Sequence, residues 1–247
     1  CLVVHRPEMY DKVIAHLQRQ EEILHVDLRK LRQQIKDRLV QITHINDMEP
    51  DMRVEHQREA EIVLDRIMTK KASETSVLLQ PFAVECVHEG YFEFGRKRIK
   101  CNVLEQLDLS SVENGYLYAF HAPEIDIESA GSVLEQYYME AFQVACMDVI
   151  RGWLQGYLER KNSVYENRYC SPSFGPGYYG MGMDTIHELL GLMDASQVGV
   201  SWNGERMSPK MSLVGTYLIA GEDVFAVDSD CRDCIGQRGG CEFCIKH

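Results

Sequence analysis

The chain has 247 residues, 45% of them hydrophobic and 26% charged, a composition typical of a soluble globular protein with one large domain or two small ones. Its 26 basic and 38 acidic residues give a formal net charge of −12, which disfavours nucleic acid as a partner. No stretch approaches the roughly 20 apolar residues of a membrane span, so we expect no membrane partner. Nine cysteines, an odd number, argue against a disulfide framework and favour a reducing, cytoplasmic setting.

Residues 8–48 are predicted to form one long amphipathic helix. Apolar side chains recur in it at alternating spacings of four and three, and Arg38 fills the one gap in this stripe. The stripe contains Leu24, Leu28, Leu31, Ile35, Ile42 and Ile45. Such a stripe either packs on its own domain or meets another chain, so a homo-oligomer formed through residues 1–49 is one possibility. Glu49-Pro50 ends the helix, and a second helix is expected from about Arg53 to Met68.

The middle of the chain alternates between strand and helix periodicity. Strands are expected at 82–87, 91–94, 115–120, 197–202 and 212–219, and helices at 126–161 and 184–193, with a short one from Asn102. The first two strands should form a hairpin through His88-Glu89-Gly90. This order predicts an α+β fold: N-terminal helices, a mixed domain of helices and antiparallel sheet over 50–222, and a small cysteine-rich tail over 223–247.

The segment from Arg168 to Asp184 is rich in glycine, proline and aromatic residues. Glycine lets the backbone come close to a ligand, and Phe174, Tyr178 and Tyr179 can stack on a flat ring or face a cation. The segment runs into a predicted helix N-terminus, which favours an anionic ligand group. The alternative is a structural connection whose aromatic side chains fill the core.

Several short motifs, in order, resemble the activation domain of cobalamin-dependent methionine synthase. They are Gly177-Tyr178, a helix ending Glu-Leu-Leu-Gly-Leu-Met-Asp194, Gln197-Val-Gly-Val200, Met207-Ser-Pro-Lys-Met-Ser212 and a strand into Gly221. A Gly-Tyr-Phe hairpin at 90–92 and a long helix carrying Glu140 precede them. The resemblance covers roughly residues 50–222.

In that family, an Arg-x-Ser-Pro-Gly-Tyr-like loop binds S-adenosylmethionine, and the domain remethylates oxidised cobalamin with one electron from a reductase. The resemblance implies that Gly175, Gly177 and Tyr178 cradle S-adenosylmethionine, while Glu140 holds a polar group or offsets the sulfonium charge. Arg168 is the candidate clamp for the ligand's carboxylate, but it lies ten residues before Tyr178, where the family's arginine lies five before its tyrosine.

The sequence contains no Asp-x-His-x-x-Gly cobalamin signature, so the resemblance implies a corrinoid protein in trans, with cobalamin on that partner, and a separate electron donor protein. Two other functions are possible. The first is a noncatalytic redox or docking module for a corrinoid methyltransferase system, and the second is a cluster-dependent corrinoid reductase without a methyl donor.

The C-terminal tail contains two Cys-x-x-Cys pairs six residues apart, formed by Cys231, Cys234, Cys241 and Cys244. Four thiolates around one centre suit zinc or an iron–sulfur cluster. The knuckle spacing favours zinc, whereas reductive chemistry favours iron–sulfur because zinc carries no electron. Two disulfides or four unligated thiols are the alternatives.

Overall fold

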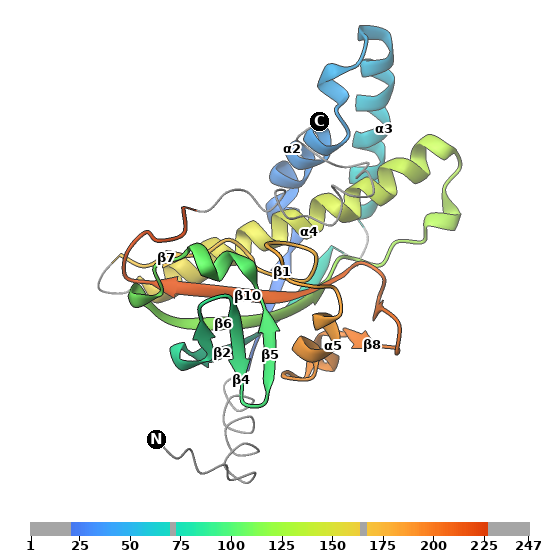
Figure 1. Ribbon diagram of the computed structural model, residues 1–247. Helices are drawn as coiled ribbons and strands as arrows, with labels where there is room; N and C mark the ends of the chain where they lie inside the picture. The colour runs from blue at the N-terminus through green and yellow to red at the C-terminus, as the bar shows by residue number, and fades with distance from the viewer. Residues whose placement is uncertain (1–20, 70–72, 164–166, 227–247) are drawn as a thin grey trace, which may run out of the picture.

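The computed structural model describes residues 21–69, 73–163 and 167–226, which are organised around a five-stranded antiparallel sheet (Figure 1). The strand order is β1-β2-β6-β10-β7. The bounds are Glu22–Asp27 for β1, Glu74–Ala83 for β2, Val112–His121 for β6, Tyr169–Cys170 for β7 and Ser212–Ala220 for β10. Because β6 pairs with both β2 and β10, the two longest interfaces of the sheet lie at its centre.

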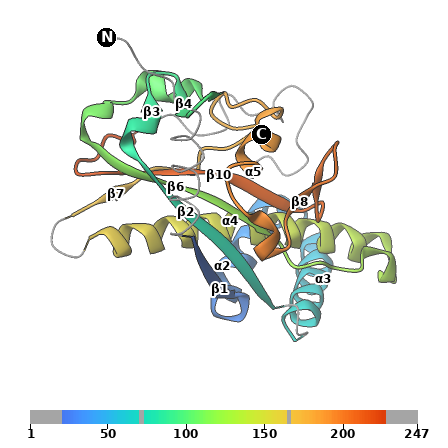
Figure 2. The same cartoon turned by 90° about the horizontal axis from the view of Figure 1, so that it is seen from below.

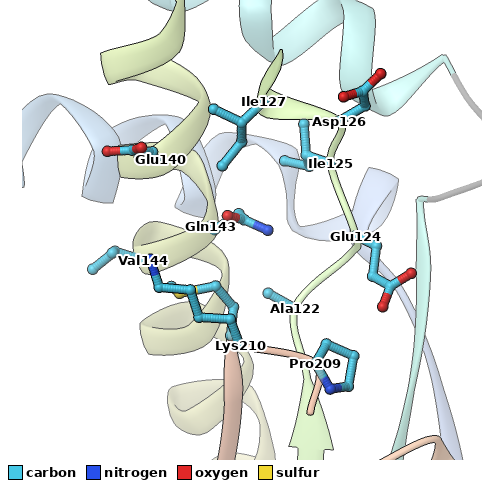
Figure 3. A pocket seen from close by; sticks show the side chains of 11 residues that line it. Ala122, Glu124, Ile125, Asp126, Ile127, Glu140, Gln143, Val144, Pro209 and Lys210 are labelled. Carbon is cyan, nitrogen blue, oxygen red and sulfur yellow. The ribbon is translucent and has the colours of Figure 1, made fainter. Parts of the chain in front are cut away.

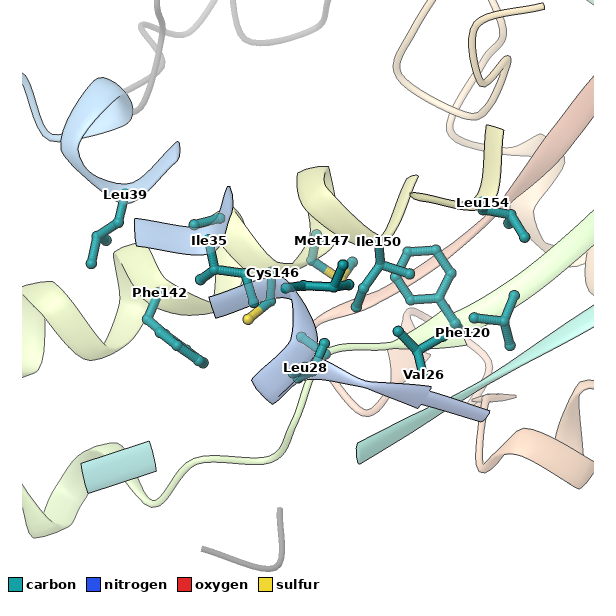
Figure 4. Close-up of a cluster of buried hydrophobic side chains, with 14 of the residues drawn as sticks. Val26, Leu28, Ile35, Leu39, Phe120, Phe142, Cys146, Met147, Ile150 and Leu154 are labelled. Carbon is teal, nitrogen blue, oxygen red and sulfur yellow. The ribbon is translucent and has the colours of Figure 1, made fainter. Parts of the chain in front are cut away.

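Helix α4 (Val133–Asn162) lies across one face of this sheet, and two further α-helices, α2 (Arg32–Ile42) and α3 (Pro50–Met68), pack against α4 (Figure 1). Alternate residues of the central strands, such as Tyr118, Phe120 and Tyr217, point into the cluster under α4. Figure 4 shows this cluster, in which Ile35 and Leu39 of α2 face Phe142 and Cys146 of α4.

The opposite face of the sheet carries a second cluster and smaller elements (Figure 2). These are a three-stranded sheet of β3 (Val87–His88), β4 (Tyr91–Phe94) and β5 (Lys97–Lys100), helix α5 (Thr185–Leu190), and a hairpin of β8 (Ser201–Trp202) and β9 (Met207–Ser208). Single 3-10 turns span Leu28–Leu31, Ile45–Asp47, Val84–Cys86, Asn102–Gln106, Leu109–Ser111, Ile127–Ser129 and Ala195–Val198. The molecule is thus a mixed structure of helices and antiparallel sheet, as predicted.

The prediction of one helix over 8–48 is wrong for its central part. Residues 22–27 form strand β1, which pairs with β2, and among the described residues the first helical turn begins at Leu28. The stripe is a packing face within the chain, because Leu28, Ile35 and Ile45 are fully buried in the hydrophobic cluster that also contains the buried side chains of α4. Residues 1–20 lie outside the described part of the chain. Described residues on both sides of residue 49 therefore contribute to the same sheet and to the same hydrophobic cluster.

Most of the remaining predicted elements are confirmed with shifted bounds. The long helix begins at Val133 rather than at 126, because Ser132 caps it by accepting a hydrogen bond from the Glu135 backbone N–H at 3.0 Å. The strand predicted at 82–87 is interrupted by a 3-10 turn at Val84–Cys86, between the end of β2 and the start of β3, and the strand predicted at 197–202 reduces to Ser201–Trp202. Among the described residues, every helix is too short or too polar to cross a membrane.

Candidate functional site

A cavity of about 670 Å³ lies between the first half of α4, the segment that follows β6, and the segment that precedes β10 (Figure 3). Its volume is in the range of small-molecule binding sites. The lining residues are Ala122, Glu124, Ile125, Asp126, Ile127, Glu140, Gln143, Val144, Pro209, Lys210 and Met211. Glu140, which the resemblance picked out, is therefore part of a concave site.

Backbone hydrogen bonds hold the walls of this cavity in place. The Ala122 N–H donates to the Met211 carbonyl at 2.8 Å, which continues the pairing of β6 with β10 beyond the sheet. The Gln143 side-chain amide, buried on α4, donates to the Pro123 carbonyl at 3.0 Å. The Ser212 hydroxyl donates to the Pro209 carbonyl at 2.7 Å. The charged side chains are thus presented from segments that are tied to the core.

The cavity carries charges of both signs. Glu124, Asp126 and Glu140 supply three exposed carboxylates, and Lys210 supplies one exposed ammonium group. Glu140 makes a long contact of 3.5 Å with the Gln136 amide, and Lys210 takes part in none of the ion pairs found among the described residues. Apolar side chains between these charges, including Ile127 and Val144, offer a surface for an uncharged ligand part.

A second, smaller cavity of about 190 Å³ lies further along α4. It is lined by Asp148, Arg151, Gly152, Gln155, Pro172, Ser173, Tyr179 and Tyr217. Arg151 donates to Asp148 at 3.2 Å, and its guanidinium lies 5.0 Å from the ring centroid of Tyr178. Burial by itself lowers the pKa of Arg151, but the carboxylate of Asp148 and the nearby side chains of Tyr118, Tyr178 and Tyr217 together outweigh burial and raise that pKa above its usual value, so the guanidinium stays charged.

The glycine-rich loop packs on the sheet next to this second cavity. Phe174 and Thr216 exchange backbone hydrogen bonds at 2.9 and 2.7 Å, and the Gly177 N–H donates to the Met181 carbonyl at 2.9 Å. A Cβ atom on Gly175 would lie 3.0 Å from the carbonyl oxygen of Val214. These glycines therefore serve the close approach of the loop to β10 and the internal turns of the loop.

The predicted site residues are only partly brought together. Glu140 lines the larger cavity, whereas Gly175, Gly177 and Tyr178 belong to the loop beside the smaller one. Arg168 lines neither cavity and pairs with Glu113 at 2.7 Å. Glu140 and Arg151, eleven residues apart, lie on the same side of α4 with a rise of about 16 Å between them.

Sequence reasoning missed Glu124, Asp126, Arg151 and Lys210. Lys210 stands inside the quoted Met207–Ser212 motif, so attention to its charge would have found it. Glu124 and Asp126 follow Pro123 between a strand and a helix, where polar loop residues often contact ligands, but no spacing rule singles them out.

The four tail cysteines, Cys231, Cys234, Cys241 and Cys244, lie outside the described residues. Within the described ranges, His, Cys, Asp and Glu side chains form no group of three or more suited to a metal ion. Burial raises the pKa of the thiols of Cys101, Cys146 and Cys170, in the case of Cys101 to about 12, which keeps them protonated at neutral pH. These three thiols are therefore core residues.

No protein-family model matches the chain, and no curated protein matches its sequence.

Proposed function

We propose that the chain binds S-adenosylmethionine in the cavity beside Glu140 and uses it to remethylate a separate corrinoid protein. One observation carries this proposal: Glu140 and the Met207–Ser212 segment, two features of the motif resemblance that are far apart in the sequence, line one cavity. In this proposal the glycine-rich loop has a structural role beside the smaller cavity, which is lined by the same helix, α4, as the proposed site.

The chemistry of the cavity suits this ligand. S-adenosylmethionine combines a sulfonium cation, an amino-acid group of both charges, and a flat adenosyl part. Glu140 can offset the sulfonium charge, Lys210 can contact the carboxylate, and the side chains of Ile127 and Val144 can cover the apolar part. A sulfonium is already a good methyl donor, so the protein has to supply mainly placement.

The reaction balances with a one-electron donor protein as co-reactant. One electron from that donor reduces the oxidised cobalt of the corrinoid, which then takes the methyl group. The sulfur–methyl bond breaks with its electron pair left on sulfur, and S-adenosylhomocysteine leaves. In this scheme the tail cysteines Cys231, Cys234, Cys241 and Cys244 would hold an iron–sulfur cluster, which would supply one-electron transfer, whereas zinc at the same cysteines would make the tail structural.

Calorimetry with S-adenosylmethionine tests the binding step. We expect saturable binding by the full chain and weaker binding by Glu140→Gln, with an unchanged melting temperature because Glu140 is exposed. No heat of binding in the parent protein would refute the proposal.

The methylation step is tested with a corrinoid protein in the Co(II) state, titanium(III) citrate as reductant, and methyl-labelled S-adenosylmethionine. Label appearing on the corrinoid supports the proposal. Reduction without label transfer would instead favour a corrinoid reductase, and ligand binding without either reaction would favour a docking module.

A further inference from the structure

The placement of charge in the larger cavity has a consequence for substrate and product. Three carboxylates and one ammonium group give the lining a charge of −2 at neutral pH. S-adenosylmethionine carries a net charge of +1, and S-adenosylhomocysteine, which lacks the sulfonium charge, carries none. Apart from the transferred methyl group, the two molecules are otherwise the same. A lining of this charge therefore attracts the methyl donor more strongly than the product.

The positive and negative groups come from different walls of the cavity. Lys210 lies in the segment before β10, and Glu140 lies on α4, while Glu124 and Asp126 lie in the segment after β6 (Figure 3). The hydrogen bonds of Ala122 with Met211 and of Ser212 with Pro209 fix the backbone on both sides of Lys210. The ammonium group and the carboxylates are thus held on separate elements, which lets them contact separate charges of one ligand.

We infer that this cavity recognises the methyl donor by its pattern of charge: Lys210 binds the carboxylate, Glu140 binds the sulfonium, and loss of the sulfonium charge on methyl transfer releases S-adenosylhomocysteine. This inference rests on the proposed function, because it names how the same site distinguishes the ligand before and after the reaction. Lys210 and Glu140 are specificity-determining residues in this account, and Glu124 and Asp126 strengthen the negative potential.

Three ligands separate the two contacts. S-adenosylmethionine has both the sulfonium and the carboxylate, S-adenosylhomocysteine has only the carboxylate, and decarboxylated S-adenosylmethionine has only the sulfonium. Glu140→Gln should lower the affinity for the two sulfonium ligands and leave the affinity for S-adenosylhomocysteine unchanged. The expected loss is only about 3- to 10-fold, because a solvent-exposed charge pair is strongly screened. Lys210→Met should weaken the two carboxylate ligands by a similar factor and leave the decarboxylated ligand unchanged or tighter.

Matched controls are Glu128→Gln, which removes a neighbouring exposed carboxylate that does not line the cavity, and Lys100→Met on β5. Both should leave all three affinities close to those of the parent. The parent's preference for S-adenosylmethionine over S-adenosylhomocysteine should also shrink between about 0.1 and 1 M salt, where the screening length falls from about 10 to about 3 Å.

All affinities are measured by calorimetry on the full chain. Absence of binding by all three ligands would refute the proposed function, and this inference with it. Binding of S-adenosylmethionine and S-adenosylhomocysteine with equal affinity, or an equal loss for both in Glu140→Gln, would refute the charge-recognition inference and leave the binding function standing.

Discussion

Asp148 is the position at which a single substitution should best test the packing of α2 on α4. Its carboxylate accepts hydrogen bonds from the Nε and Nη2 atoms of Arg38, the former at 2.7 Å, and from Arg151 at 3.2 Å. The side chains of Asp148, Arg38 and Arg151 are only 20%, 23% and 16% exposed. Asp148→Asn keeps the shape of the side chain and removes its charge, which leaves two guanidinium groups facing a neutral amide.

The expected loss lies between two known limits. Breaking a fully buried ion pair costs about 3–5 kcal/mol, and breaking an exposed one costs about 0–1 kcal/mol. Since these side chains are about four-fifths buried, we expect Asp148→Asn to lower the free energy of unfolding by about 2 kcal/mol. For a chain of this size, that corresponds to a fall in melting temperature of about 4–8 °C.

Urea denaturation of the full chain measures this loss. The matched control is Glu93→Gln, which also neutralises a carboxylate paired with an arginine. Its partner Arg98 is 67% exposed, so this ion pair should contribute little to stability. We expect the control to unfold at nearly the same urea concentration as the parent. Arg38→Met and Asp148→Asn should also be non-additive in the double variant, because they remove the same contact.

A loss in Asp148→Asn no larger than that of Glu93→Gln, together with additive effects of the two substitutions, would refute this reasoning. It would mean that Arg38 does not reach α4 in solution.

Two further predictions concern acid stability and the tail. Lys36 and Arg32 donate hydrogen bonds to Glu61 and lower its pKa from 4.5, so its contribution to stability is present above that unfolded-state value and is lost as pH falls. Glu61→Gln should therefore lower the free energy of unfolding at pH 7, by less than about 1 kcal/mol because Glu61 is 36% exposed. The gap to the parent, measured by urea denaturation, should close as the pH falls below 4.5, and a gap that stays constant with pH would contradict this. For the tail, we expect anaerobically prepared protein to absorb near roughly 400 nm, and we expect dithionite to bleach this absorption and Cys231→Ser to remove it. A colourless protein with one equivalent of zinc would make the tail structural. Absence of both metals would refute the site.

Elements whose local pattern agrees with their packing could be predicted from the sequence. Helix α3 begins at Pro50, a residue favoured in the first helical turn, and α4 is long enough for its periodicity to be clear. Strands β6 and β10 each contain a long run of buried, mainly apolar residues because both faces of the central sheet are covered by hydrophobic clusters. In each case, burial and local propensity favour the same structure.

Strand β1 could not be predicted in this way. The spacing of Leu24, Leu28 and Leu31 continues the helical stripe smoothly, yet Glu22–Asp27 pairs along its whole length with β2, about 50 residues away in the sequence. The strand forms because of this distant partner, and nothing within residues 22–27 identifies that partner. Local periodicity therefore extended a helix through a segment whose structure is decided by tertiary pairing.

The candidate site was predicted only in part, for a similar reason. Glycines in the 168–184 segment are compatible both with ligand approach and with close packing on a strand, and the contact of Gly175 with Val214 identifies the second role. Lys210 and Glu124 line one cavity because β6 and β10 end side by side, with Ser212 opposite His121. That proximity depends on strand pairing and has no signature in either segment.

The polar residues on the apolar helix α4 show how the structure narrows the choice among candidates. Gln143 donates to the Pro123 carbonyl and so fixes a wall of the cavity, and Asp148 binds Arg38, so each of these two side chains has a structural partner. The carboxylate of Glu140 lies 3.5 Å from the side-chain amide nitrogen of Gln136, which is long for a hydrogen bond. A carboxylate held at a cavity with so weak a protein contact is better placed to meet a cationic ligand than one already bound to arginine. Glu140 is for this reason the strongest of the predicted site residues.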